Sequence, residues 1–366
     1  MENELVYRLA LGMVPHIGDV HARILTKIMG SAEAVFRAHP QHLEKIEGIG
    51  KVRASMIRKY RDFDACHAEI RFMEKYGIQP LSHLDDAYPQ RLLQCYDAPA
   101  MLFYKGNADL NAQRVIAVVG TRNHSAYGRY CCEELIASLA GSGVQVISGL
   151  ALGIDTIAHR QSLATGMETI GVLAHGLDQL YPSQNRQLSI EMIQRGGLLT
   201  DFRSRSNPDK MNFPKRNRIV AGMCDALVVV ETGKKGGSMI TAALACGYNR
   251  EVFAYPGRTN DMRSEGCNTL IATQRAGLIL NGTQLLMEMN WSAENQAKEK
   301  KQGSLFLQLS PEEDILVKLL REKDMVHIDD LRERSSLSTS TVANALLMLE
   351  MQGVIESVPG KLYALK

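Results

Sequence analysis

Aromatic side chains, long apolar runs and patterned cysteines are all scarce in this chain of 366 residues. No apolar run reaches the roughly 18 residues of a membrane-spanning helix, and the amino terminus has no basic segment followed by an apolar core. We therefore expect neither membrane insertion nor secretion. The seven cysteines include no C-x-x-C pair. Their spacing is typical of reduced thiols in a cytoplasmic protein and does not suit a structural metal site.

Neither sign of charge is in excess, because 42 lysines and arginines stand against 40 aspartates and glutamates. With a net charge of +2, a surface for a polyanion must be a local patch of the protein. Aromatic residues make up 6% of the chain, which leaves few side chains for stacking on bases. The length allows about two to three domains.

The most informative stretch runs from residue 114 to 153. An apolar run at 115–119 ends at Gly120, Thr121 and Arg122, an amphipathic segment follows at 128–140, and a second apolar run at 144–147 ends at Ser148 and Gly149. Strand, turn, helix and strand in this order predict the first βαβ unit of a parallel sheet. Both turns would lie at the carboxyl edge of the sheet, where such folds bind ligands. Exposed glycine backbone beside an arginine favours an anionic ligand.

Strands and helices keep alternating downstream of this unit. We predict helices at 154–164, 184–195, 214–223 and 237–247, and strands at 168–174, 198–202, 226–231 and 251–255. A further strand within 98–106 should extend the sheet. So regular an alternation predicts an α/β fold with a doubly wound parallel sheet.

A basic segment at 203–218 interrupts this alternation. It holds six basic residues against the single acid Asp209: Arg203, Arg205, Lys210, Lys215, Arg216 and Arg218. A second glycine turn, Gly236 and Gly237 followed by Ser238, again precedes a helix. Such a segment is often only a solvated surface. Its place at the ligand-binding edge, together with the glycine turns, favours a phosphate-binding rim.

Several enzyme classes built on such a sheet do not fit the sequence. Dinucleotide dehydrogenases need G-x-G-x-x-G and an acidic residue after the second strand, and P-loop ATPases need G-x-x-x-x-G-K-[ST]; none of these features is present. Asp155, His159, Asp178, Asp201 and Glu231 lack the spacing of metal ligands. We interpret His159 and Glu231 as buried structural groups, and we expect no catalytic residue, no metal and no cofactor.

The first 76 residues contain an internal repeat. Residues 17–22, IGDVHA, match residues 49–54, IGKVRA, and each copy is a glycine turn that opens an amphipathic helix. This pattern is typical of a helix-hairpin-helix or SAM-like module, whose backbone N–H groups can bind phosphate. A docking module without a ligand remains the alternative, because basic residues (12) barely exceed acidic residues (10) over residues 1–76.

Residues 289–309 are polar and weakly patterned, which predicts a linker. Beyond it we predict helices at 311–323, 328–335 and 339–351 and a β-ribbon at 354–357 and 361–364, the elements of a winged helix. Its third helix has no lysine or arginine, and residues 310–366 hold 10 acidic against 7 basic residues. Charge thus favours a protein partner over duplex DNA. The predicted domains are 1–76, 77–288 and 310–366.

Ten motifs, in order along the chain, resemble the DNA-processing protein A family (DprA, also called Smf). They are YPQRL (88–92), PAMLFYKG (99–106), GTR (120–122), SGLALGID (148–155), GLDQLYP (176–182), FPKRNRIVAG (213–222), VVVET (228–232), GGSMITAA (236–243), VFAYPG (252–257) and GCNTLI (266–271). The sequence departs from the family pattern at Thr200-Asp201 and at Ala174-His175.

The resemblance implies an extended Rossmann-like domain that dimerises and has no known catalytic role. It also implies a single-stranded-DNA-binding protein that shields incoming DNA in natural transformation and helps load the RecA recombinase. The alternative is a nucleotide phosphoribohydrolase-like enzyme on the same type of sheet, which needs P-G-G-x-G-T-x-x-E. Aligning its glycines on Gly236 and Gly237 puts Ala243 where the glutamate should be and Met239 where a glycine should be.

We predict that single-stranded DNA binds across the glycine turns and the basic segment. Arg122 and Lys215 should contact phosphates, Asn217 should reach a base edge or organise its loop, and Phe213 and Tyr181 are the nearest stacking candidates. The full predicted site is Gly120, Thr121, Arg122, Ser148, Gly149, Phe213, Lys215, Arg216, Asn217, Arg218, Gly236, Gly237 and Ser238.

Overall fold

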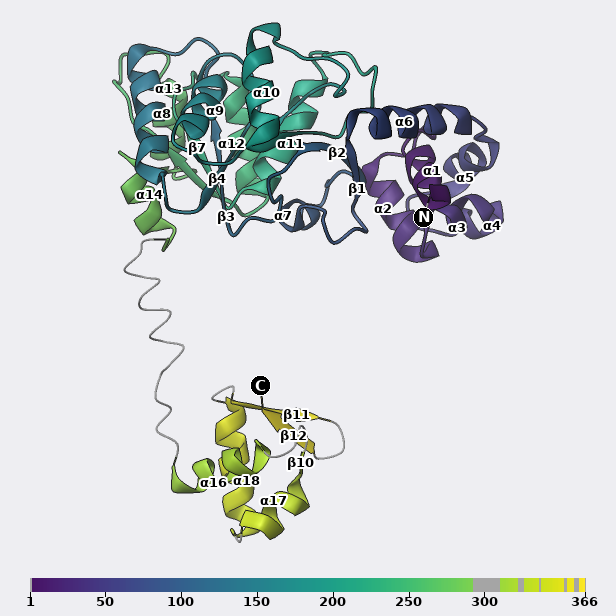
Figure 1. Ribbon diagram of the computed structural model, residues 1–366, viewed down its shortest axis with the longest axis vertical. Helices are drawn as coiled ribbons and strands as arrows, with labels where there is room; N and C mark the ends of the chain where they lie inside the picture. The colour runs from purple at the N-terminus through teal and green to yellow at the C-terminus, as the bar shows by residue number, and fades with distance from the viewer. Residues whose placement is uncertain are drawn as a thin grey trace. The chain divides into compact units, whose positions relative to one another are not determined.

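A computed structural model describes residues 2–291, 310–321, 326–335, 337–351, 354–358 and 362–365. The chain divides into two compact units, Met1–Ser292 and Ala293–Lys366 (Figure 1). Of the linker predicted at 289–309, residues 292–309 lie outside the described residues. Among the helices that are described, none combines the length and the apolar composition that a membrane span requires.

The first unit is built on a sheet of nine strands. The strands are β1 (Gln79–Ser82), β2 (Met101–Gly106), β3 (Arg114–Val119), β4 (Val144–Ser148), β5 (Thr169–Val172), β6 (Gly196–Thr200), β7 (Ala226–Val229), β8 (Glu251–Ala254) and β9 (Gly277–Leu278). Their order is β1-β2-β6-β5-β4-β3-β7-β8-β9. From β6 to β9 all neighbours are parallel, whereas β2 runs antiparallel to β6 and β1 antiparallel to β2.

The predicted α/β fold with a parallel sheet is therefore confirmed, including the strand within 98–106 that extends it. The antiparallel pairing at that edge and the strand β1 were not predicted. The predicted bounds of two helices, α9 (Ile154–Ala164) and α12 (Gly237–Gly247), match the structure. Strand β6 begins and ends two residues earlier than predicted, because Gly196 and Gly197 pair with β5 although glycine has little strand propensity.

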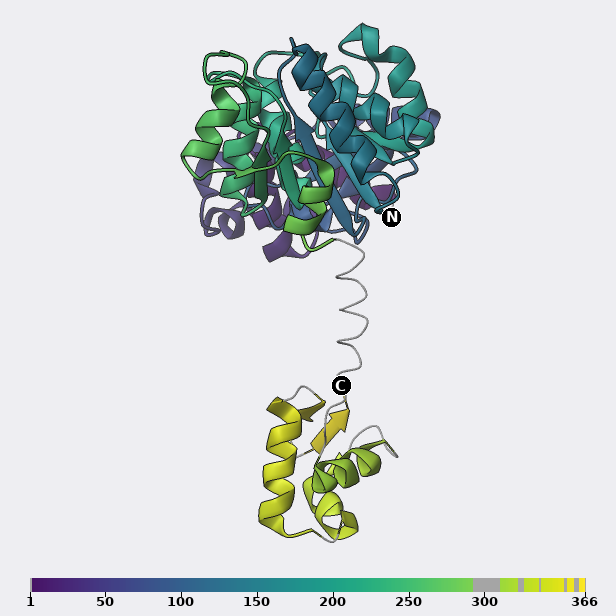
Figure 2. The same ribbon diagram turned by 90° about the vertical axis from the view of Figure 1, so that its left-hand side faces the viewer.

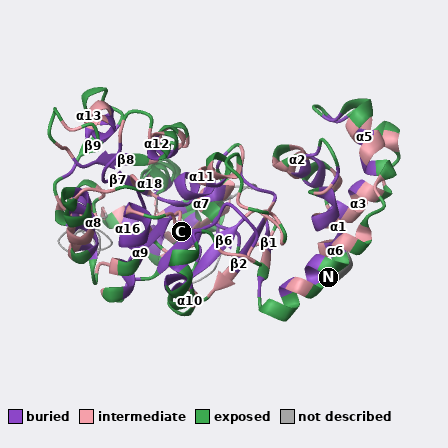
Figure 3. Ribbon diagram, turned by 90° about the horizontal axis from the view of Figure 1, so that it is seen from above, coloured by how far each residue is buried: buried purple, intermediate pink, exposed green. Residues whose placement is uncertain are grey.

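Helices cover both faces of the sheet (Figure 2). Besides α9 and α12 they are α8 (Ala126–Leu139), α10 (Arg186–Gln194), α11 (Asn212–Met223), α13 (Glu265–Ala272) and α14 (Gly282–Glu288). Side chains of β3 alternate between two buried cores, as a strand requires. Ala117 and Val119 pack with α11 and α12 on one face, and Ile116 and Val118 pack with α8 on the other. The buried strands between exposed helix faces are visible in Figure 3.

Six helices precede the sheet: α1 (Glu2–Leu11), α2 (Asp19–Met29), α3 (Ala32–Arg37), α4 (Pro40–Glu44), α5 (Gly50–Lys59) and α6 (Phe63–Tyr76). The two copies of the sequence repeat form the starts of α2 and α5, as predicted. Side chains then link these helices to the sheet domain. Asp19 accepts a hydrogen bond from Arg218 (2.8 Å), and Glu69 accepts one from the Ser204 amide (2.9 Å). A domain boundary at residue 76 stays a prediction.

The described residues of the second unit form three helices, α16 (Pro311–Leu320), α17 (Ile328–Ser335) and α18 (Thr339–Met351), and three strands, β10 (Val326–His327), β11 (Ile355–Val358) and β12 (Leu362–Leu365). The strands form a small antiparallel sheet in the order β10-β12-β11. This is the predicted winged helix. In α18, Leu346 and Leu349 are buried, while Leu347 leaves an apolar edge that is 54% exposed.

Candidate functional site

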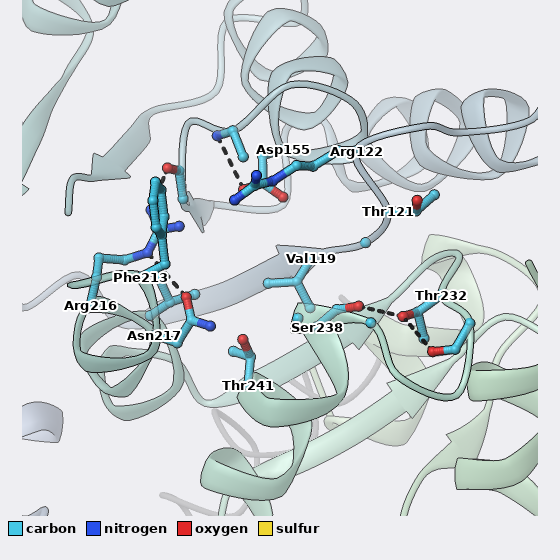
Figure 4. A pocket seen from close by; sticks show the side chains of 17 residues that line it. Val119, Thr121, Arg122, Asp155, Phe213, Arg216, Asn217, Thr232, Ser238 and Thr241 are labelled. Atoms are coloured by element: carbon cyan, nitrogen blue, oxygen red, sulfur yellow. Dashed lines mark hydrogen bonds between the residues drawn. The ribbon is translucent and has the colours of Figure 1, made fainter. Parts of the chain in front are cut away.

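A pocket of about 340 Å³ opens at the carboxyl ends of β3, β4 and β7 (Figure 4). The loops after these three strands and the helices α11 and α12 form its walls; we call it the central pocket. Ten of the thirteen predicted site residues line it: Gly120, Thr121, Arg122, Gly149, Phe213, Arg216, Asn217, Gly236, Gly237 and Ser238. The carboxyl edge of a parallel sheet brings these distant segments together, as expected from such topology.

Two glycines allow the loops to pack closely. Gly153 has φ 89°, ψ −131°, and an added Cβ there would overlap the carbonyl oxygens of Thr121 and Arg122. An added Cβ at Gly149 would lie 2.5 Å from the guanidinium nitrogens of Arg216. A hydrogen bond from the Ile154 amide to the Thr121 carbonyl (3.2 Å) then joins the loop after β3 to the start of α9. The shape of the pocket thus depends on glycine at these two positions, because a side chain at either one would overlap the neighbouring loop or Arg216.

At the mouth of the central pocket an exposed cation lies over an aromatic ring. The guanidinium carbon of Arg122 is 5.1 Å from the centroid of the Phe213 ring. Phe213 also contacts the Tyr181 ring edge-on, with the centroids 6.1 Å apart. A smaller space of about 60 Å³ adjoins this cluster, lined on one side by Leu173 and Tyr181; we call it the aromatic hollow. A guanidinium and ring faces side by side suit a ligand with both phosphate and bases.

Arg216 is a buried part of the pocket wall and is only 5% exposed. It donates to the carbonyl oxygens of Gly149 and Val172, and its Nε donates to Asn217 Oδ1 (3.1 Å). Burial lowers the pKa of Arg216 and raises the pKa of Asp155, while the attraction between their charges counters both shifts. Arg216 therefore positions the loop after β4 and orients Asn217, and it adds positive charge beneath the pocket.

Three predicted site residues do not line the central pocket. Ser148 is fully buried and donates to the Val118 carbonyl (2.6 Å). Lys215 is exposed beside the pocket. Arg218 points to the N-terminal helices, where its Nη2 lies 2.8 Å from Asp19 and 2.7 Å from Asp201. We expected the basic segment to form one phosphate-binding rim. Instead, Arg216 and Arg218 point to different sides of the helix α11 and contact different parts of the protein.

The pocket also contains residues that were absent from the predicted site: Val119, Ala151, Asp155, Val220, Thr232, Gly233 and Thr241. Thr232 accepts a hydrogen bond from Ser238 (2.7 Å) and so fixes the start of α12. Its place directly after the strand predicted at 226–231 was the available signal. Thr241 lies three residues after Ser238, on the same side of that helix.

His159 and Glu231, the polar residues that we interpreted as buried structural groups, make contacts within the fold. Burial lowers the pKa of His159 to about 3, so the ring is neutral, and its Nδ1 lies 2.6 Å from Thr169 Oγ1. Glu231 accepts a hydrogen bond from the Ser125 amide (2.8 Å) at the start of α8. Across the described ranges of the chain, no three His, Cys, Asp or Glu side chains come together as a metal site would require.

Comparison with known proteins agrees with this architecture. A family model described as DNA recombination-mediator protein A matches residues 79–290, and one described as the DprA winged helix domain matches residues 305–361. The DNA processing protein DprA of Streptococcus pneumoniae is 39% identical over 238 residues, which are 65% of this chain and 83% of that protein. Protein Smf of a Synechocystis strain is 30% identical across 99% of this chain and 98% of its own length.

Two of the similar solved structures are 29% and 32% identical in sequence to this chain. The X-ray structure of DNA processing protein A from S. pneumoniae superposes with a TM-score of 0.68 and 32% identity, covering 77% of this chain and 97% of that one. A structure of DNA processing protein A from Helicobacter pylori, which describes that protein's mode of binding single-stranded DNA, gives a TM-score of 0.54 and 29% identity and covers 58% of this chain and 96% of that one. Since the family model alone spans more than half of the sequence, this chain belongs to the DNA recombination-mediator protein A family.

Proposed function

We propose that this protein binds single-stranded DNA at the central pocket, shields incoming DNA during natural transformation and helps load the RecA recombinase. It acts in the cytoplasm as a homodimer formed through the domain at 77–288, and it has no catalytic role. The observation that carries the proposal is the exposed Arg122 guanidinium over Phe213, at the mouth of a pocket walled by glycine backbone. The single-strand binding described for the H. pylori relative supports it.

The residues of the pocket also argue against the phosphoribohydrolase alternative. Ala243, which stands where that enzyme would have its glutamate, is exposed on α12 and is not among the residues of the pocket wall. Asp155 is the one acidic residue in that wall, and its charge is opposed by the buried Arg216. A carboxylate neutralised in this way is poorly suited to act at a ribose.

Removing the Arg122 guanidinium should weaken single-strand binding. We expect Arg122→Ala to lower the affinity for an oligothymidylate by about tenfold, because one charge-assisted contact is lost. The slope of log affinity against log salt should flatten by about 0.7 for each lost phosphate contact, and adding Lys215→Ala should flatten it further. Fluorescence titration with single and double strands at several salt concentrations measures both quantities.

The matched control for this test is Arg195→Ala, which removes the same charge from an exposed site just before β6, at the opposite edge of the sheet. That variant should bind like the unmodified protein. A salt slope unchanged by Arg122→Ala would show that the strand binds a different surface.

The winged helix should contribute little to single-strand affinity. Its described third helix, α18, exposes Leu347 and Met348 rather than basic side chains, and residues 310–366 carry an excess of three acids. We expect deletion of residues 304–366 to leave single-strand affinity within about threefold. Binding of duplex DNA by the 304–366 fragment at micromolar concentration and physiological salt would contradict the assignment of this domain to a protein partner.

A further inference from the structure

A third space in the first unit lies next to the central pocket. None of the residues proposed above to contact DNA lines it. It has a volume of about 200 Å³ and is formed by the loop after β3, the exposed sides of α8 and α9, and the turn before α10. Arg129 and Arg160 contribute its cations, and the side chains of His124, Gln161 and Gln184 surround them. We call it the outer hollow.

The three spaces form a continuous series along one loop. Gly149 and Ala151 line the central pocket, Ala151 and Leu152 line the aromatic hollow, and Leu152 and Gly153 line the outer hollow. The loop after β3 runs the same way, with Arg122 in the first two spaces and His124 in the third. A strand that leaves Arg122 and passes the aromatic hollow therefore arrives at the outer hollow.

The floor of the outer hollow is held to the same loop by hydrogen bonds. Asn185 is 1% exposed, and its Nδ2 donates to the Leu150 carbonyl and to Thr156 Oγ1, both at 2.9 Å. Thr156 in turn donates to the Ala151 carbonyl (2.6 Å). The outer hollow and the central pocket thus share a wall that these hydrogen bonds connect.

The two arginines are available for a ligand. Within the part of the chain that the structure describes, no carboxylate lies within ion-pair distance of Arg160, which is exposed. Arg129 forms only a long contact with Glu133, 3.7 Å between Nη1 and Oε1, and the two side chains are 56% and 44% exposed. Such exposed pairs are weak, so a phosphate can displace Glu133 from Arg129.

We propose that the outer hollow binds a backbone phosphate of the same DNA strand, several nucleotides away from the phosphate at Arg122. Arg160 supplies the main charge, and Arg129 joins it when it leaves Glu133. The Gln161 and Gln184 amides can donate further hydrogen bonds, and no Phe, Tyr or Trp is among the residues that line the outer hollow, so this contact should depend on the backbone and not on the base sequence. The inference rests on the proposed single-strand binding and extends the binding site beyond the central pocket.

Strand length distinguishes this site from the first one. We would titrate the full chain with oligothymidylates of about 4 and about 16 nucleotides, the range over which single-strand sites vary. Arg160→Ala should lower affinity for the long strand by about fivefold, flatten its salt slope by about 0.7, and leave the short strand unchanged. Glu133→Gln, which removes the competing carboxylate, should raise affinity for the long strand by about twofold. Arg195→Ala again serves as the matched loss of charge.

The outcomes separate the two proposals. If Arg122→Ala weakens both strands while Arg160→Ala and Glu133→Gln change neither, the outer hollow is not a subsite and the proposed function stands. Equal losses on short and long strands for Arg160→Ala would also overturn the inference, since Arg160 would then belong to the first contact. If neither Arg122→Ala nor Arg160→Ala affects any strand, the proposed binding surface itself is wrong.

Discussion

Replacing Arg218 by methionine is expected to lower the free energy of unfolding of the first unit by about 3–5 kcal/mol. Arg218 donates to Asp19 and Asp201 through Nη2 and to the Asp97 carbonyl through Nη1 (2.6 Å), and its side chain is 16% exposed. Burial raises the pKa of Asp201, and the Arg218 charge opposes that shift. Without the guanidinium, a buried carboxylate would face Asp19 with no counter-charge. The fluorescence of Trp291, the single tryptophan, measures the loss in a urea titration, because it packs against the core beneath α8.

Arg37→Met is the matched control. Arg37 pairs with Glu33 on the surface of α3 at 2.6 Å, but its side chain is 72% exposed, so its loss should cost less than about 1 kcal/mol. Equal urea midpoints for the two variants would mean that the buried network contributes no stability. At urea concentrations at which the Arg218→Met variant is folded, it should still bind single-stranded DNA, because Arg218 does not line the central pocket.

Gly153→Ala should abolish most single-strand binding. The backbone at this position (φ 89°, ψ −131°) is one that residues with a Cβ rarely adopt, and a strained residue of this kind costs about 1–3 kcal/mol. The added methyl would also overlap the carbonyls of Thr121 and Arg122, which are main-chain atoms and can move only with their whole loop. Since that loop carries Arg122, we expect affinity for single strands to fall by at least about tenfold.

Gly166→Ala is the matched control, because it introduces backbone strain without steric overlap between the added methyl group and other atoms. Gly166 also has a positive φ of 76°, but nothing lies within 4 Å of an added Cβ there. This variant should lose about 1–2 kcal/mol of stability and keep its affinity for single strands. If Gly153→Ala and Gly166→Ala were equally stable and bound DNA equally well, contact between the two loops would not control the position of Arg122.

The sequence alone determined the layers of this protein and the place of its candidate site. The alternation of apolar runs with amphipathic segments predicted the parallel sheet, because strands and helices impose different periods on the buried side chains. The same alternation placed the turns at Gly120, Gly149 and Gly236 on one edge. In the C-terminal unit, the sequence pattern predicted the three helices and the β-ribbon of the winged helix.

Only the tertiary structure decided the surroundings of Lys215, Arg216 and Arg218 within the basic segment. Lys215, Arg216 and Arg218 are close in sequence, but successive residues of a helix are about 100° apart around its axis and so face different neighbours. Arg216 meets the Gly149 and Val172 carbonyls, Arg218 meets carboxylates from α2 and from the end of β6, and Lys215 meets solvent. Those partners lie 17 to 199 residues away along the chain. Since no local pattern carries that information, the surroundings of these three residues depend on how the helices pack.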